Sequence, residues 1–432
     1  MNKKIYVVLK EQIDLARPDA EELKRVDKLT EEFVMVLERE LKEAGYGAEV
    51  FIGGSYAKGT LIRKEQYDVD VFVRFDWKYD SISSMLETIL RRLCKTDGYS
   101  LEILHGSRDY FKVHVKGYRV YFEVIPVTKI KKPKEERNVT DLSYFHVPYV
   151  RRKIKGLQDQ VRLAKTFFAA QKVYGAESYI QGFSGYAVEC LIIYYRSFVK
   201  MLGSFSQMKI GERVVIDIEK KYKKKNDVFF ELNESKLQSQ IILIDPTYKE
   251  RNALASLSHE TFARVQKAGR DFLKKPRAGF FAAQETNVGA LKKLGSKGGR
   301  EFLHLRISTD KQAGDIAGTK LKKFVRLLNE ELNKYFRILR EEFEYDEKHS
   351  ADIYFVLQSR GEIIRIGPPL FMKHHVSAFK KEHMHTYEKN KHVHAVVEVN
   401  FTARAYLDVW MKSNEKTARE MGITGMKILL EN

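Results

Sequence analysis

Hydrophobic residues in the first third of the chain follow one period typical of helices and another typical of strands. Between residues 19 and 45 they recur every three or four positions, which predicts an amphipathic helix that ends at Gly45. Two-residue alternation predicts a strand over 68–75. A helix is predicted over 83–95, and the segment from residue 48 predicts a strand, a glycine turn and a short helix. Similar apolar runs predict three more strands. These three further strands lie at 101–106, 110–117 and 118–127.

The rest of the chain is richer in helical patterns. Residues 152–202 predict two long helices, separated by a glycine-containing break at 176–185. A third long helix is predicted over 319–339, followed by strands at 352–358, 362–369 and near 397. We therefore expect an α+β multidomain protein. Its parts would be a mixed-sheet domain over 1–150, a mainly helical central domain over 151–275 and a C-terminal α+β region over 276–432.

Charge is distributed unevenly over these parts. The 432 residues carry a net charge of +19. Residues 1–150 hold 26 basic and 25 acidic side chains, whereas 151–300 hold 29 and 14. A basic region with interleaved aromatic residues favours a nucleic acid partner.

Several sequence features bear on cellular location. The most apolar stretch, 183–195, is too short to cross a bilayer and contains Glu189. The N-terminus lacks the pattern of a signal peptide, and two cysteines suit a reducing compartment. We expect a soluble cytoplasmic protein without a membrane partner.

The segment from Gly53 to Phe75 carries the most informative chemistry. Asp68 and Asp70 should lie on one face of a strand, where a cation would relieve their repulsion. Glu123 interrupts another apolar strand, so it should have a cation or a partner. Three carboxylates on neighbouring strands could hold two Mg²⁺ ions for phosphoryl or nucleotidyl transfer. The alternatives are a solvated strand face for the aspartates, an edge position for Glu123 and an ordinary turn at Gly53–Ser55.

This arrangement of Gly-Ser, Asp-x-Asp and a third carboxylate resembles the polymerase-β-type nucleotidyltransferase superfamily. Beyond it, segments such as SYFHVPYVRRKIKG, VYGAESYIQGFSGYAVECLIIYY and IDPTYKERNALASLS resemble the archaeal-type (class I) CCA-adding enzymes, which are tRNA nucleotidyltransferases. The resemblance is specific over about residues 50–280 and looser beyond. It implies a catalytic head domain over 1–150, a nucleotide-recognition neck over 151–275 and a tRNA-binding body and tail over 276–432.

The resemblance also implies roles for individual residues. Asp68, Asp70 and Glu123 correspond to the catalytic, metal-binding triad. The family has Glu first and Asp third, and it has an arginine where this chain has Lys58. The other matching positions would bind the nucleotide, with Arg251 reading the base edge; they are Gly54, Ser55, Lys58, Ser143, His146, Lys165, Tyr174, Arg251 and Asn252.

The implied reaction adds C, C and A to the tRNA 3′ end from CTP and ATP, without a nucleic-acid template and with two Mg²⁺ ions. Arg251 offers only hydrogen-bond donors, which suit cytosine N3 and adenine N1 but not the N–H groups of uracil and guanine. Two other functions stay open: a different RNA nucleotidyltransferase such as a poly(A) polymerase, and a non-enzymatic RNA-binding protein. A homodimer is also left open, because the sequence does not set the oligomeric state.

Overall fold

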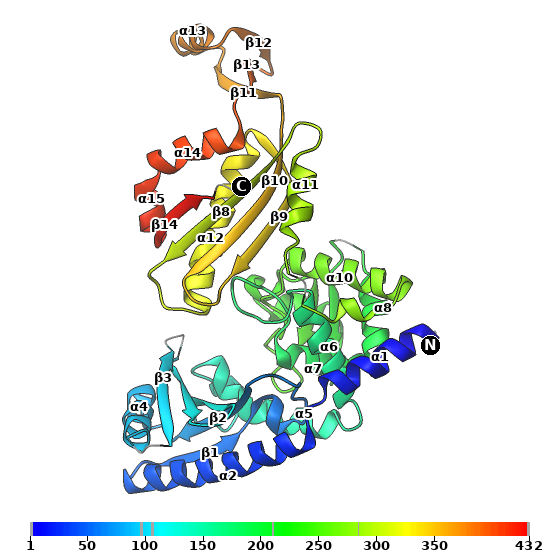
Figure 1. Ribbon diagram of the computed structural model, residues 1–432, viewed down its shortest axis with the longest axis vertical. Coiled ribbons are helices and arrows are strands. Elements are labelled where there is room, and N and C mark those ends of the chain that lie inside the picture. Colours follow the sequence, from blue (N-terminus) through cyan, green and yellow to red (C-terminus); the bar gives the residue numbers. More distant parts are fainter. Residues whose placement is uncertain (1–2, 96–97, 105–107, 210, 284, 430–432) are drawn as a thin grey trace. The chain divides into compact units, whose positions relative to one another are not determined.

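The computed structural model describes residues 3–95, 98–104, 108–209, 211–283 and 285–429, and Figure 1 draws their helices and strands. The chain divides into two compact units, 1–284 and 285–432. Residues 1–284 therefore hold every site residue predicted from the sequence. The further division of this unit near residue 150 stays a prediction.

The first part of this unit is a five-stranded mixed sheet in the order β1-β2-β5-β4-β3 (Figure 1). Strand β5 lies in its centre, parallel to β2 and antiparallel to β4. Helices α2 and α4 pack on one face, where Phe33 and Leu86 join Val71 and Phe122 in a common core. The elements are α2 (Ala20–Glu43), β1 (Ala48–Ile52), α3 (Gly54–Ala57), β2 (Tyr67–Phe75), α4 (Ile82–Leu93), β3 (Tyr99–Leu104), β4 (Tyr110–Val115) and β5 (Val120–Thr128).

These elements confirm the periodicity analysis. Helix α2 begins after Asp19, whose side chain accepts hydrogen bonds from two backbone N–H groups, and Gly45 follows its end with a φ of +70°. Val69 and Val71 are fully buried, whereas Asp68 and Asp70 point to the opposite, partly exposed face of β2. The last two residues of the strand predicted over 101–106 lie outside the described residues.

The second part of this unit is mainly helical, and α1 belongs to it, because Ile5 and Leu9 pack into its core. A short parallel pair, β6 and β7, completes it. The elements are α1 (Lys3–Ala16), α5 (Ser143–Lys153), α6 (Gln158–Ala170), α7 (Gly185–Tyr195), α8 (Phe198–Gln207), β6 (Val214–Asp217), α9 (Asp227–Glu231), β7 (Ile241–Ile244) and α10 (His259–Lys274).

The prediction of two long helices over 152–202 is wrong in two respects. The first predicted helix is interrupted at 154–157, between the end of α5 and the start of α6. The second predicted helix is divided into α7 and α8 at Arg196, which has a left-handed φ of 60°. Ser197 then caps the start of α8 by accepting a hydrogen bond from Lys200 N. The apolar pattern continues through both helices because both are buried, so the hydrophobic period does not reveal the break.

The unit from residue 285 contains a four-stranded antiparallel sheet in the order β14-β8-β10-β9 and a three-stranded sheet in the order β11-β13-β12. Phe324 of α12 packs against Leu305 and Phe355 of the larger sheet. The elements are α11 (Val288–Gly295), β8 (Arg300–Thr309), α12 (Asp315–Asn333), β9 (Phe336–Tyr345), β10 (Ser350–Ser359), β11 (Glu362–Pro369), α13 (Lys373–Glu382), β12 (His385–Lys389), β13 (His392–Glu398), α14 (Ala403–Ser413), α15 (Glu415–Glu420) and β14 (Ile423–Ile428).

The helix predicted over 319–339 ends earlier, at Asn333. Residues 336–339 instead begin β9, where buried Phe336 pairs with Ser359 of β10. The mainly apolar residues Phe-Arg-Ile-Leu suit both a helix and a strand, and pairing with β10 decides between them. The strands predicted at 352–358, 362–369 and near 397 are confirmed as β10, β11 and β13.

Candidate active site

Asp70 and Glu123 are register partners on the central strands β2 and β5. Asp68 lies two residues before Asp70 and on the same face. Because β5 is an interior strand of the sheet, an edge position for Glu123 is ruled out. The structure thus brings together the three carboxylates that the sequence singled out.

Gly54 allows the turn after β1 to approach these carboxylates closely. It has a φ of +59°, and a Cβ added there would lie 1.5 Å from Asp70 Oδ2. Gly53 donates its backbone N–H to the Asp70 carbonyl oxygen at 2.9 Å. Ser55 follows in the short helix α3, so the predicted Gly54–Ser55 turn and the acidic residues form one site. A larger residue at position 54 would displace Asp70.

The carboxylates are short of positive charge. Burial raises the pKa of Asp70, and the neighbouring Asp68 raises it further. Burial also raises the pKa of Glu123, followed by the charge of Asp70, while Lys112 opposes the shift. Lysines only partly offset these shifts: Lys64 lies 2.7 Å from Asp68 Oδ1 and Lys112 lies 4.0 Å from Glu123 Oε1. The charges of Lys58 and Lys165 also act to lower the pKa of Asp70.

The chemistry of this donor set fits a divalent cation with oxygen ligands, since three closely spaced carboxylates repel one another without one. In the described part of the chain, the side chains form no group of three or more acidic, His or Cys residues already arranged around a metal position. Lys64 holds Asp68, so this lysine would have to exchange with an incoming ion.

Helix α7 contributes a completely buried carboxylate, Glu189, that sequence analysis did not assign to the site. It accepts hydrogen bonds from Lys58 Nζ at 2.6 Å and from Thr60 Oγ1 at 2.7 Å. Lys165 Nζ of α6 lies 3.6 Å from it and donates to Thr60 Oγ1 at 3.1 Å. Two predicted nucleotide-binding residues, Lys58 and Lys165, therefore meet at one buried acid.

The pKa shifts of Glu189 and Lys165 agree with their pairing. Burial alone would raise the pKa of Glu189, but the charges of Lys58 and Lys165 hold it below its usual value. Burial lowers the pKa of Lys165 to about 8, against the opposing charge of Glu189. The signal in the sequence was a single carboxylate inside the apolar run 183–195. In the sequence this carboxylate argues against a membrane span and does not identify its partners.

Asp245 is a second buried carboxylate that sequence analysis missed, and it follows directly after the fully buried strand β7. Its Oδ2 lies 2.8 Å from Arg251 Nη1 and 2.9 Å from His146 Nε2. Its Oδ1 accepts hydrogen bonds from Tyr186 OH at 2.9 Å and from the backbone and hydroxyl of Thr247, both at 2.8 Å. Asp245 therefore joins α5, α7 and the turn that carries Arg251.

The charges around Asp245 are well compensated. Burial would raise its pKa, but the hydrogen bond from His146 and the charge of Arg251 lower it well below the usual range. An ionised carboxylate only accepts hydrogen bonds, so His146 must carry its hydrogen on Nε2. Burial lowers the pKa of His146, and its ring stacks on Tyr186 with centroids 3.9 Å apart.

The remaining predicted residues differ in their surroundings. Asn252 is buried and uses its whole amide: Oδ1 accepts from Leu243 N and Leu254 N, and Nδ2 donates to Lys236 O and Ser239 Oγ. This leaves no free donor or acceptor for a nucleotide, so Asn252 holds the backbone beside Arg251. Tyr174 lies next to α7, because a Cβ on Gly185 would be 2.9 Å from its hydroxyl. Burial raises its pKa.

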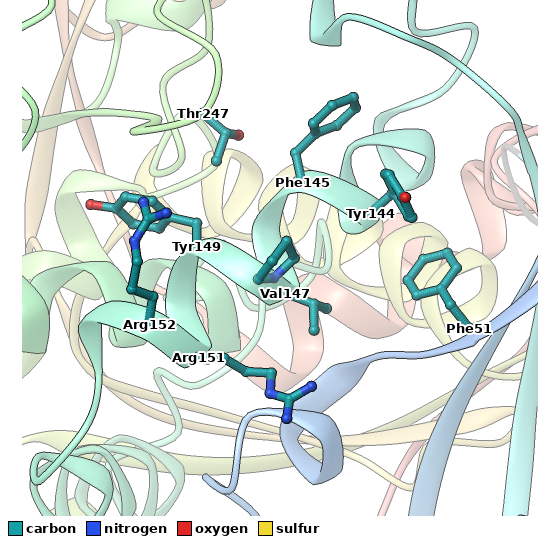
Figure 2. A pocket seen from close by; sticks show the side chains of 9 residues that line it. Phe51, Tyr144, Phe145, Val147, Tyr149, Arg151, Arg152 and Thr247 are labelled. Atoms are coloured by element: carbon teal, nitrogen blue, oxygen red, sulfur yellow. The ribbon is translucent and has the colours of Figure 1, made fainter.

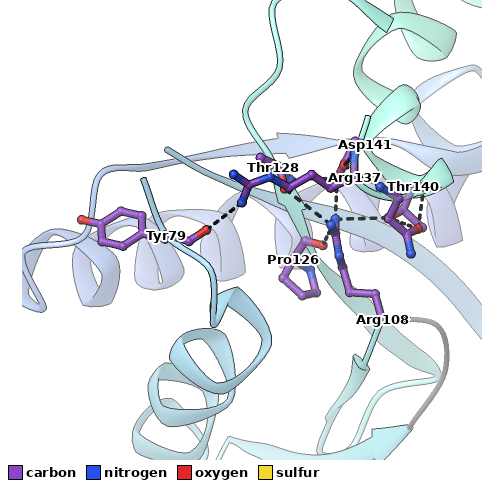
Figure 3. A network of polar contacts seen from close by, with 8 residues as sticks. Tyr79, Arg108, Pro126, Thr128, Arg137, Thr140 and Asp141 are labelled. Atoms are coloured by element: carbon purple, nitrogen blue, oxygen red, sulfur yellow. Dashed lines mark hydrogen bonds and ion pairs between the residues drawn. The ribbon is translucent and has the colours of Figure 1, made fainter. Parts of the chain in front are cut away.

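Ser143 begins α5, and a polar network just before it in the chain links the start of α5 to the end of β5 (Figure 3). Asp141 is buried and accepts hydrogen bonds from Thr128 N at 2.8 Å and from Arg137 N at 3.0 Å. Arg108 pairs with Asp141 and also donates to Pro126 O at 3.2 Å. The strand of Glu123 and the helix of Ser143 and His146 are thereby fixed together.

Three arginines of the second unit have different surroundings, and two of them already have partners. Arg306 makes a bidentate pair with Asp352 at 3.0 and 2.8 Å. Arg365 donates to Tyr335 OH at 3.2 Å. The third, Arg300, is half-buried, and its Nε has no partner among the described residues.

Comparison with known proteins matches two family models: the nucleotidyltransferase domain over residues 34–146, and the second domain of tRNA nucleotidyltransferases over residues 159–282. A CCA-adding enzyme of Nanoarchaeum equitans is 34% identical over 73% of this chain and 74% of its own length. The CCA-adding enzyme of Archaeoglobus fulgidus is 30% identical over 80% and 74%, and that of Pyrococcus abyssi is 27% identical over 99% and 95%.

Solved structures show the same fold at low identity. The Cid1 poly(U) polymerase with Mg 3′-dATP bound has a TM-score of 0.51 at 12% identity, over 66% of this chain and all of its own. A Cid1 structure that describes RNA terminal uridylyl transferase activity has a TM-score of 0.52. In the described residues, no helix is long and apolar enough to cross a membrane.

Proposed function

The chain belongs to the family of CCA-adding enzymes, and on that premise we propose that it adds C, C and A to tRNA 3′ ends from CTP and ATP. The observation that carries the proposal is the pairing of Asp70 with Glu123, next to Asp68, beside a turn that only glycine fits. The relatives supply the substrate class, and the site supplies the chemistry.

The reaction is nucleotidyl transfer. The 3′-hydroxyl oxygen of the RNA forms a bond to the α-phosphorus, the bond from that phosphorus to the bridging oxygen breaks, and pyrophosphate leaves. The hydroxyl proton passes to solvent. Asp68, Asp70 and Glu123 would hold two Mg²⁺ ions, which supply stabilisation of the charge that develops on the reacting oxygens. Glu123, one methylene longer than the aspartate of the family pattern, reaches the same sheet face from β5.

Triphosphate binding falls to the lysines beside the carboxylates. Lys58 and Lys165 share the buried Glu189, which holds them next to Asp70. Each ammonium has three donors, so each keeps hydrogens for phosphate oxygens after its contact with Glu189 or Thr60. Gly54 and Ser55 lie in the turn that approaches Asp70 and complete the cradle.

Base selection falls to Arg251. Its Nη1 is held by Asp245, which fixes the guanidinium plane and leaves its other donors for a base edge. Donors accept cytosine N3 and adenine N1 and reject the N–H groups of uracil and guanine. Selection of C and A thus needs no template strand.

One assay tests the proposal. The full-length protein, Mg²⁺ and a tRNA transcript without its 3′ CCA are incubated with CTP, ATP or both. We expect two additions with CTP alone and exactly three residues with both nucleotides. Long A tails would instead support a poly(A) polymerase, and no extension would support a non-enzymatic RNA-binding protein; either result overturns the proposal.

A further inference from the structure

The outer face of α5 carries an open pocket of about 510 Å³ that none of the predicted nucleotide-binding residues lines (Figure 2). Residues His146 and Val150 of α5 face the protein core. The pocket is lined by residues at the intervening positions, together with Phe51 of β1 and Thr247. The volume lies within the range of pockets that bind small ligands or single groups of larger ones.

The walls of this pocket are aromatic and already fixed. Phe51 stacks on Phe72 with centroids 4.8 Å apart and meets Tyr144 edge-on at 5.5 Å. The Tyr144 ring is 42% exposed, and the Arg74 guanidinium lies 3.4 Å from its centroid on one face. Tyr149 is anchored by its hydroxyl, which donates to Glu219 at 2.8 Å. Rings held in this way can stack on a base with little loss of conformational freedom.

The rim of the pocket is positively charged. Arg151 and Arg152 are both exposed, and within the described residues neither forms an ion pair. Among the described residues, no carboxylate lines the pocket, and the nearby Glu219 is paired with Lys153 at 2.8 Å. Two free guanidinium groups beside aromatic rings suit phosphates that are joined to unpaired bases.

The pocket begins where the candidate active site ends. Phe72, which supports Phe51, lies two residues after Asp70 on the same face of β2. Tyr144 follows Ser143, and Thr247 donates to the Asp245 carboxylate that holds Arg251. A segment bound here would thus be continuous with a chain whose end reaches the carboxylates.

We propose that this pocket binds unpaired nucleotides of the RNA 3′ end, by stacking bases on Tyr144 and its aromatic neighbours and by pairing phosphates with Arg151 and Arg152. The inference rests on the proposed function, because that function supplies an RNA with a single-stranded 3′ end. It adds a binding site for the RNA strand that is separate from the site of the incoming nucleotide.

The test compares two RNAs with the full-length protein in the absence of nucleotides. One is a hairpin with a four-nucleotide unpaired 3′ overhang, and the other is the same hairpin with a blunt end. In fluorescence anisotropy, the double variant R151Q/R152Q should bind the overhang RNA about tenfold more weakly and the blunt RNA unchanged. Two lost phosphate contacts should also reduce the slope of log Kd against log salt by about 1.4.

A second variant and a matched control separate stacking from charge. Tyr144→Leu keeps apolar bulk but removes the ring, so it should weaken overhang binding about fivefold or more with little change in the salt slope. The control R25Q/R39Q removes two exposed arginines from α2, a helix that contributes none of the residues lining the pocket, and should leave both Kd values for RNA unchanged. Thermal unfolding of each variant checks that the fold is intact.

The outcomes also separate this inference from the proposed function. Equal weakening of both RNAs, or no weakening of either, would overturn the pocket assignment, as would loss of CTP binding in R151Q/R152Q. If the pocket variants lose overhang binding but the wild-type protein adds no C or A, the pocket assignment stands and the proposed function is overturned. If the wild-type protein adds CCA correctly but the pocket variants bind the overhang RNA unaltered, the proposed function stands and the pocket assignment is overturned.

Discussion

Arg251 and Asp245 form an ion pair in which Nη1 lies 2.8 Å from Oδ2, and only the arginine side of the pair reaches solvent. The carboxylate is fully buried, whereas the Arg251 side chain is 23% exposed. Asp245 also holds His146 at 2.9 Å, so one acid orients both groups. A base-reading arginine needs this constraint, because a mobile guanidinium could turn its donors toward the oxygen of a wrong base.

The first prediction is that Asp245→Asn lowers base selectivity more than it lowers triphosphate binding. An amide offers one acceptor oxygen, and its NH₂ group would face the donors of Arg251 and His146. We expect the ratio of kcat/KM for CTP over UTP to fall about tenfold or more. Single-turnover extension of a tRNA transcript that ends immediately before CCA measures this ratio.

Asp217→Asn is the matched control for this prediction. Asp217 ends β6, the strand paired with β7, and its Oδ2 accepts from Tyr222 N rather than from Arg251 or His146. Its replacement should leave the CTP to UTP ratio unchanged. If Asp245→Asn retained full discrimination against UTP, Asp245 would not be the residue that positions the base reader.

The strands that carry the carboxylate triad could be predicted from the sequence, and the reason is local. Two-residue alternation in 68–75 is enough to place Asp68 and Asp70 on one face, opposite Val69 and Val71. The apolar neighbours of Glu123 predict a strand but leave an edge position open, which only the pairing of β5 with β2 and β4 excludes. Both strand predictions use only residues close in the chain.

Glu189 and Asp245 could not be predicted in the same way, because their partners are remote in sequence. Lys58 is 131 residues from Glu189, and His146 is 99 residues from Asp245. A lone acid in an apolar run indicates only that some partner exists. Packing of α6 and α7 against the segment after α3 decides which partner it is.

The second prediction is that Glu189→Gln destabilises the protein. The substitution leaves Lys58 and Lys165 buried without their common carboxylate, and removal of one partner from a buried pair costs about 3–5 kcal/mol. We expect the free energy of unfolding to fall by that amount in denaturant titrations followed by circular dichroism. The double variant Glu189→Gln/Lys58→Gln should be less unstable than Glu189→Gln alone, since it removes one unpaired charge.

Glu231→Gln is the control for a salt bridge at the surface. Glu231 pairs with Lys249 at 2.6 Å, and the two side chains are 44% and 43% exposed. Exposed pairs contribute about 0–1 kcal/mol, so its replacement should change stability by no more than that. Equal losses from Glu189→Gln and Glu231→Gln would contradict a special role for the buried acid.

The third prediction concerns the triad. Glu123→Gln should lower the rate of CMP incorporation at least about a hundredfold, because metal-assisted stabilisation of the transition state supplies several kcal/mol and each 1.36 kcal/mol is a factor of ten. Glu123→Asp should retain far more activity, since an aspartate is the family residue at this position. The measurement is single-turnover incorporation with saturating Mg²⁺ and CTP.

Glu102→Gln provides the comparison within the same sheet. Glu102 lies on β3, where it is exposed and paired with His114 at 3.2 Å. Its replacement should leave the incorporation rate unchanged. Near-normal turnover in Glu123→Gln would mean that Asp68 and Asp70 suffice, and the role of Glu123 would then have to be abandoned.

The fourth prediction is a loss of nucleotide binding at alkaline pH that originates from Lys165. Burial lowers the pKa of this lysine to about 8, so it is charged below that pH and neutral above it. The charge is what binds triphosphate, so kcat/KM for CTP should fall as the pH rises above about 8. Since kcat/KM reports groups of the free enzyme, the fall should appear there rather than in kcat.

Lys165→Arg tests this assignment, because a guanidinium stays protonated throughout the range. The kcat/KM of this variant for CTP should be lower than that of the wild type at pH 7, since the planar guanidinium does not fit the contacts to Thr60. Its kcat/KM should stay level between pH 7.5 and 9. Lys129→Arg, at an exposed lysine paired with Glu49, should keep the wild-type profile. An alkaline fall that persists in Lys165→Arg would assign the titration to another group and leave the triphosphate role of Lys165 without support.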